Sequence, residues 1–137
     1  MMLKKLGFAE IAVAILNTLR NYTNYPCYDA VPENAPSPFI FVEIVGKQDS
    51  STKTMYKETF TAYLHAIASP SDCRTEIYSM IKTIEETLTE RIKLPPGVTN
   101  ILQTETGVQA LQQDETGEFH AVLGYEIMVS YGYKTKI

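Results

Sequence analysis

The sequence predicts a single α+β domain over residues 1–137, a two-layer sandwich with two helices on one face of a mainly antiparallel sheet of four to five strands. Two observations predict this class. Apolar residues recur at helical spacing in two separate stretches, and runs rich in β-branched and aromatic residues lie between and after them. The predicted order is helix, three strands, helix, two strands, for which packing in two layers is the simplest arrangement.

The first helix is predicted within Leu6–Tyr22, where apolar residues recur every three or four positions. They form one stripe: Phe8, Ile11, Ala12, Ile15, Leu16 and Leu19. Four prolines follow between residues 26 and 38, and they exclude helix and favour extended chain. This stretch predicts a short edge strand over Cys27–Val31 and then a proline-rich loop. Phe39–Val45 is the first long strand, bounded by Pro38 and Gly46.

The polar tract Lys47–Lys57 holds no core residues and is predicted to form a long hairpin tip before the strand Tyr56–Ala68. Ser69 and Pro70 then give a helix start, with serine as N-cap and proline in the first turn. The second helix should run to about Ile92, a rod of roughly 30 Å. Its predicted stripe is Cys73, Ile77, Met80 or Ile81, Ile84, Leu88 and Ile92.

The end of the chain is predicted to be a hairpin. Leu94–Gly97 contains two prolines and a glycine and stops the second helix. Two strands follow, Val98–Gln113 and Glu118–Tyr133, joined by the turn Asp114–Gly117. The last residues, Lys134–Ile137, are expected to fray unless a neighbouring subunit orders them.

Composition excludes several function classes. Hydrophobic residues make up 45% of the chain and charged residues 20%, as in an ordinary globular protein. A net charge of -4 offers no basic field for phosphate, so no nucleic acid recognition is expected. No apolar stretch approaches the roughly 20 residues needed for a membrane span. Cys27 and Cys73 are interpreted as reduced thiols of a cytoplasmic protein.

No residue pattern predicts catalytic, cofactor-binding or metal-ligating chemistry. His65 and His120 both fall within predicted strands, and neither has a Cys, Asp or Glu at a recognised metal-ligand spacing. Structural roles are therefore expected for both. A thiol nucleophile at Cys27 served by His65 stays open as an alternative, because such pairs assemble in space and not in sequence.

The sheet has enough apolar residues to cover both of its faces. The face left open by the helices should carry a set such as Ile40, Val42, Ile44, Tyr63, Ile67, Val122 and Met128, or its aromatic counterpart. Exposed apolar area of that extent indicates a subunit interface, which closed rotational symmetry would commonly cover. The candidate interface residues are Tyr28, Val31, Pro32, Gln48, Asp49, Lys53, Met55, Tyr63, Ile67, Met128, Tyr131 and Tyr133.

An ordered pattern along nearly the whole chain resembles a known family. A first helix is followed by Tyr28-Asp-Ala-Val-Pro-Glu-Asn-Ala-Pro-Ser-Pro-Phe-Ile-Phe-Val and then by a polar tract containing Lys53-Thr54. The late strand Phe119-His-Ala-Val-Leu-Gly-Tyr-Glu follows helix two and a turn. This pattern is similar to the tail terminator proteins of long-tailed bacteriophages and prophages, also called tail completion or head-tail joining proteins.

The resemblance implies an α+β fold and a structural, non-enzymatic role in virion assembly. It implies a ring-shaped homo-oligomer, commonly a hexamer, that caps the finished tail tube and joins it to the head connector. The expected partners are copies of itself, the tail tube protein and the head-tail connector protein, with no cofactor. The expected locations are the bacterial host cytoplasm during assembly and then the virion tail.

Two alternatives stay open. The first is a head-closure or neck component of the same assembly. The second is a small ligand-binding or thiol-dependent enzyme domain that uses Cys27 and His65. Within the ring hypothesis, the proline-stiffened segment Tyr28–Pro38 is predicted to lie at or beside a subunit contact.

Overall fold

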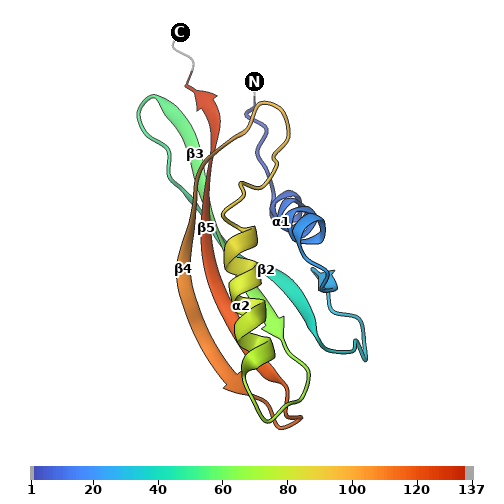
Figure 1. Ribbon diagram of the computed structural model, residues 1–137. Coiled ribbons are helices and arrows are strands. Elements are labelled where there is room, and N and C mark those ends of the chain that lie inside the picture. The colour runs from blue at the N-terminus through green and yellow to red at the C-terminus, as the bar shows by residue number, and fades with distance from the viewer. Residues whose placement is uncertain (1, 135–137) are drawn as a thin grey trace.

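The computed structural model describes residues 2–134. Two helices cover one face of a five-stranded sheet, as Figure 1 shows. The elements in chain order are α1 (Phe8–Tyr22), β1 (Cys27–Tyr28), β2 (Phe39–Asp49), β3 (Met55–Ile67), α2 (Thr75–Thr87), β4 (Thr99–Gln113) and β5 (Phe119–Tyr133). The predicted class and element order are confirmed. The prediction for residues 135–137 lies outside the described residues.

The strands are ordered β1-β2-β3-β5-β4. Only the β1–β2 pair is parallel, and the other three pairs are antiparallel. Directly opposite residues share a sheet face, and Leu64 of β3 lies between Val42 of β2 and Leu123 of β5, all of them buried. The helices cover this face. Their fully buried side chains are Ile11, Ile15, Leu19, Ile77, Met80 and Ile84.

The apolar set predicted for the open face is divided between the two faces. Ile40 and Val42 are buried beneath the helices, and Ile44 lies on the same side because it pairs with core Ala62. The remaining members, Tyr63, Ile67, Val122 and Met128, lie on the open face. The prediction was wrong for the first three because side chains alternate along a strand, and the register between strands decides which sets combine.

The second helix is shorter than predicted, since it begins at Thr75 and ends at Thr87. Ser69 is not its N-cap, because the Ser69 backbone N–H donates to Glu76 Oε1 at 2.6 Å and residues 69–72 form a loop. The helix therefore spans about 20 Å at 1.5 Å per residue. Leu88 and Ile92 are buried, as the stripe predicts, but they lie beyond the helix.

One glutamine of β4 holds the chain that leaves α2. Gln103 Nε2 donates to the carbonyls of Leu88 at 2.7 Å and Glu90 at 2.8 Å. Its Oε1 accepts from the Ile92 backbone N–H at 3.0 Å and from Asn100 Nδ2 at 2.9 Å. Backbone groups just beyond a helix need such partners, and here a single side chain bonds three of them.

The β2–β3 hairpin extends further than predicted. The polar tract was predicted to be a long tip, but Gly46–Asp49 pairs with Glu58–Thr61 after a bulge at Val45, which leaves residues 50–54 as the tip. Polar residues can form strand here because this end of the hairpin projects past the helices (Figure 1). The edge strand predicted over Cys27–Val31 is only two residues long, because the chain turns away after Tyr28.

A buried carboxylate ties the chain before α1 to the sheet. Glu58 is 4% exposed, and its Oε1 accepts a hydrogen bond of 2.5 Å from the Tyr131 hydroxyl. That hydroxyl in turn accepts from the Leu6 backbone N–H at 3.0 Å. Lys5 and Lys47 place their Nζ atoms 3.5 and 3.6 Å from Glu58 Oε2. This cluster fixes where α1 begins over the sheet.

Candidate functional site

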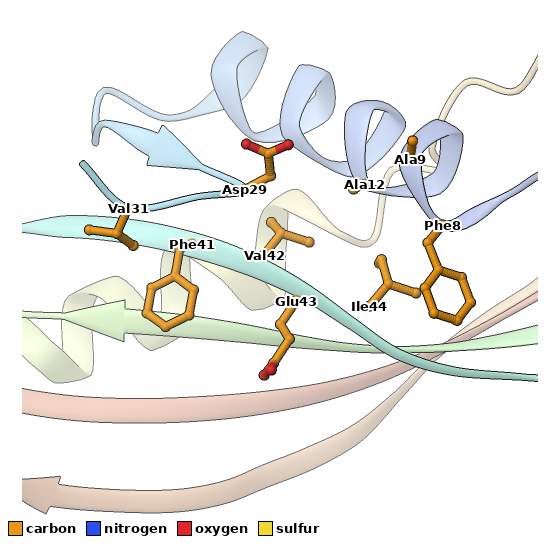
Figure 2. Close-up of a pocket in the computed structure, with 9 residues that line it drawn as sticks. All are labelled: Phe8, Ala9, Ala12, Asp29, Val31, Phe41, Val42, Glu43 and Ile44. Atoms are coloured by element: carbon orange, nitrogen blue, oxygen red, sulfur yellow. The ribbon is translucent and has the colours of Figure 1, made fainter. Parts of the chain in front are cut away.

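A groove of about 390 Å³ lies beside the outer edge of β2. Figure 2 shows Phe8, Ala9 and Ala12 of α1 on one side of the groove, with Val42 and Ile44 of β2 pointing towards α1, while Phe41 and Glu43 point to the other face of the sheet. Asp29 and Val31, just after β1, complete the lining. The groove is largely apolar, with the carboxylate of Asp29 beside it and that of Glu43 turned to the open face, a composition that favours binding of an extended apolar segment over a small anion.

The edge of β2 along this groove is free. β1 pairs only with Ile40 and Phe41, and no other strand within residues 2–134 pairs with Val42–Asp49 on that side. An edge strand presents unpaired backbone N–H and C=O groups that can pair with another strand. The groove therefore combines an apolar lining with free backbone hydrogen-bonding groups.

Residues of α1 that the sequence assigned to the core help to form this groove. Phe8 was predicted as part of the buried stripe, but it is 46% exposed. It lies at the rim because its ring packs edge-to-face on Phe60 at a centroid distance of 6.3 Å, at the start of the helix. Ala9 and Ala12 are small enough to leave the space open. The sequence signal that could have indicated this groove is the pair Ala9 and Ala12, two small residues three positions apart and close to Phe8.

β4 forms the opposite edge of the sheet. It is 15 residues long, and two of its apolar side chains are exposed, Leu102 at 51% and Val108 at 45%. Lysine and proline often protect edge strands, yet β4 contains neither, and Glu105 is its one charged residue. Three register shifts with β5 bend it. The sheet thus has two long unpaired edges.

The open face carries a chain of hydrogen bonds between ionisable side chains. His65 Nδ1 lies 2.9 Å from His120 Nε2, and His65 Nε2 lies 3.0 Å from Glu43 Oε1. The Phe41 ring stacks on His65 at 4.1 Å, with the ring planes within 3°. Two neutral histidines complete this chain if His120 donates to His65 and His65 donates to Glu43. Both histidines therefore have structural roles, as predicted, although sequence gave no sign of their contact.

We expect acid to weaken the fold through His120. Burial, followed by the nearby charge of His65, lowers the pKa of His120, while Asp114 opposes the shift. The unfolded chain then binds more protons than the folded chain below the ordinary pKa of about 6.5, so stability is lost as pH falls through and below that value.

Thermal unfolding at pH 7.5 and 5.5 checks this prediction. The wild-type melting temperature should fall more on acidification than that of His120→Gln, whose amide can still donate to His65. An equal fall in the two proteins would contradict it.

The structure separates the two residues of the thiol-enzyme alternative. Cys27 is buried in the core and pairs in register with helix-side Ile40, whereas His65 lies on the open face. Burial raises the pKa of the Cys27 thiol, and its Sγ donates to the Tyr25 carbonyl at 3.2 Å. A thiol with a raised pKa and no base beside it is a poor nucleophile.

Two features are absent from residues 2–134. No three His, Cys, Asp or Glu side chains gather there in an arrangement that could hold a metal ion. Within the same residues, no helix combines the length and apolar character needed to cross a membrane.

The predicted interface residues lie in separate places. Tyr28, Val31 and Pro32 lie next to the groove, where Val31 is part of the lining. Gln48, Asp49, Lys53, Met55 and Tyr133 lie at the hairpin end of the sheet. Tyr63, Ile67 and Met128 lie on the open face. Tyr131 is bonded to Glu58, so its hydroxyl is already used within the subunit.

These features define the class of protein. The domain has two unpaired sheet edges, a partly aromatic open face and an apolar groove, which together describe an interaction module. The chain belongs to a family of phage tail termination proteins: the family model described as "Putative tail termination protein" matches residues 2–137. The predicted resemblance is confirmed. Tail termination is a structural role, in accord with the prediction that the protein is not an enzyme.

A solved structure shares the fold. A chain from the "Virion of native gene transfer agent (GTA) particle" superposes with a TM-score of 0.73 at 15% sequence identity. The match covers 90% of this chain and 99% of that chain. A comparison with curated proteins gave no match.

Proposed function

We propose that this protein ends the growth of a phage tail tube by capping it as a ring-shaped homo-oligomer and joins the capped tube to the head connector. The observation that carries the proposal is the family match over residues 2–137. The geometry supports it, since free sheet edges and exposed apolar side chains are expected of a subunit that is stable in an assembly.

The proposed partners are copies of the same chain, the tail tube protein and the head-tail connector protein. The proposed locations are the bacterial host cytoplasm and then the virion tail. A ring has two ends for two different partners, and the hairpin end, with Gln48, Asp49 and Lys53, is one exposed candidate for such a contact. The segment with Tyr28, Val31 and Pro32 is proposed to lie beside a subunit contact, because it borders the groove.

Tube growth in vitro tests the proposal. Purified protein added to polymerising tail tube protein should stop elongation, so that tubes measured by electron microscopy stay short and cannot be extended by fresh tube protein. Bovine serum albumin at equal concentration serves as the control. Continued growth at saturating protein would contradict tail termination.

The head-closure alternative is tested in parallel. The same protein is mixed with isolated filled heads, and its sedimentation with heads is compared with its sedimentation with tubes. A terminator should bind tubes in the absence of heads. Binding to heads together with no binding to tubes would favour the neck component.

A further inference from the structure

We propose that the outer edge of β2 in one copy binds β4 of a second copy as an antiparallel strand, so that the sheet continues from subunit to subunit. The inference rests on the ring proposed above and specifies its contact. The two copies contribute different surfaces, so the contact is head-to-tail. Such contacts repeat from copy to copy and close into a ring when the rotation between neighbours allows it.

The strand directions permit this pairing. β2 is antiparallel to β3, β3 to β5, and β5 to β4, so β2 and β4 run in opposite directions within one sheet. A second copy placed beside the first with its helices on the same side therefore brings β4 antiparallel to β2. The free edge Val42–Asp49 is about 26 Å long at 3.3 Å per residue, and β4 is long enough to cover it.

One register between β2 of the first copy and β4 of the second places compatible side chains opposite each other. If Val108 lies opposite Ile44, then Glu105 lies opposite Lys47, which gives one apolar pair and one pair of opposite charge. All four residues lie on the helix side of their own sheet, because their partners there are Leu123, Ala62, Tyr125 and Phe60. Val108 would then enter the groove beneath α1.

One irregularity in each strand agrees with the same register, while the β4 shift between Val108 and Ala110 falls at the end of the matched segment, opposite Ile44 and Val42. β2 has a shift between Ile44 and Gly46, and β4 has one between Glu105 and Gly107. These shifts fall opposite each other when Val108 faces Ile44. The extra residue of β2 and the extra residue of β4 then lie opposite each other, so the residues on either side of these bulges stay paired.

Within residues 2–134, no cationic side chain forms an ion pair with Glu105. Burial raises the pKa of Glu105, and a hydrogen bond to Glu85 and the charge of Glu85 add to the shift. A lysine brought by a neighbouring copy would relieve this crowding of carboxyl groups. Lys47 can reach Glu105 because its side chain is partly exposed and lies over the Phe60 ring on the helix side of the sheet, where its Nζ is also 3.6 Å from Glu58 Oε2.

Two substitutions test the contact, each with a matched control. Glu105→Lys and Val108→Lys place a cation on the edge, and lysine on an edge strand is a natural block to pairing. Glu115→Lys makes the same charge change at an exposed turn, and Val13→Lys replaces a 50% exposed valine of α1. Light scattering after size-exclusion chromatography measures assembly in solution, and electron microscopy measures rings on tube ends.

We expect both edge variants to weaken assembly about tenfold or more, while both controls assemble like wild type. Circular dichroism should show all four folded, with Glu105→Lys melting at or above the wild-type temperature. Wild-type assembly by the edge variants would overturn the edge contact but leave tube capping standing. Rings that form normally yet no longer bind tubes would assign the edge to the tube protein instead. A wild-type protein that forms no ring in solution or on tubes would remove both proposals.

Hydrogen exchange gives a second readout that is independent of substitutions. Backbone amides within Val42–Asp49 and β4 should exchange more slowly in the assembled protein than in dilute subunits, because strand pairing engages them. Unchanged exchange in both segments on assembly would overturn the inference, even if the edge variants assemble poorly.

Discussion

Glu58→Ala should lower the free energy of unfolding by about 2–3 kcal/mol, mostly because a hydrogen bond to a charged, buried carboxylate is lost. Glu58 is 4% exposed and accepts from Tyr131, whose hydroxyl also holds the Leu6 backbone N–H. The pairs with Lys5 and Lys47 add little, since both lysines are partly exposed and screened by water. Urea unfolding at pH 7 measures the loss.

A double-mutant cycle with Tyr131→Phe isolates the shared bond. Because both substitutions remove it, the double variant should lose about 1 kcal/mol less than the sum of the two single losses. Glu126→Ala, at an exposed position on β5, serves as the control and should change stability by less than about 0.5 kcal/mol. Strict additivity of Glu58→Ala and Tyr131→Phe would show that the cluster does not act as one unit.

Gln103→Ala should cost at least about 2 kcal/mol, since it removes four hydrogen bonds that each contribute roughly 0.5–1.5 kcal/mol net. The side chain bonds the carbonyls of Leu88 and Glu90 and the N–H groups of Ile92 and Asn100. Gln103 joins the chain after α2 to β4, together with Arg91, which donates to the Asn100 carbonyl. Chemical denaturation gives the value, and faster amide exchange at Ile92 would locate the damage.

Gln109→Ala is the matched control on the same strand. Its amide donates only to the nearby carbonyls of Thr106 and Gly107, so its loss should cost less than about 0.5 kcal/mol. Equal losses for the two glutamines would contradict the assigned role of Gln103.

Sequence patterns predicted the parts of the fold that depend on local periodicity. The stripe of α1 placed Ile11 and Ile15 correctly in the core. The class and element order followed from these patterns. The end of α2 could not be predicted, because the apolar spacing continues to Ile92 while a glutamine from a later strand bonds the carbonyls of Leu88 and Glu90, just beyond the helix.

The surface clusters were harder to predict from the sequence, since they depend on how neighbouring strands are aligned. Glu58 directly follows the polar tract and looks exposed, but it is buried against Tyr131, which also bonds the Leu6 backbone. The contact between His65 and His120 joins residues from β3 and β5, whose alignment the sequence does not give. Val31 was predicted as an interface residue and lines the groove, but its neighbours Phe8 and Ala12 come from a helix 20 residues earlier in the chain.

Imaging of tube ends tests the central claim most directly. Tail tubes grown from purified tube protein are mixed with this protein, and their ends are averaged by electron microscopy. The account predicts a closed ring of rotational symmetry on one end of each tube, in which neighbouring subunits meet through β2 and β4. Tubes with bare ends at saturating protein, or protein bound along their sides with no ring at the end, would contradict it.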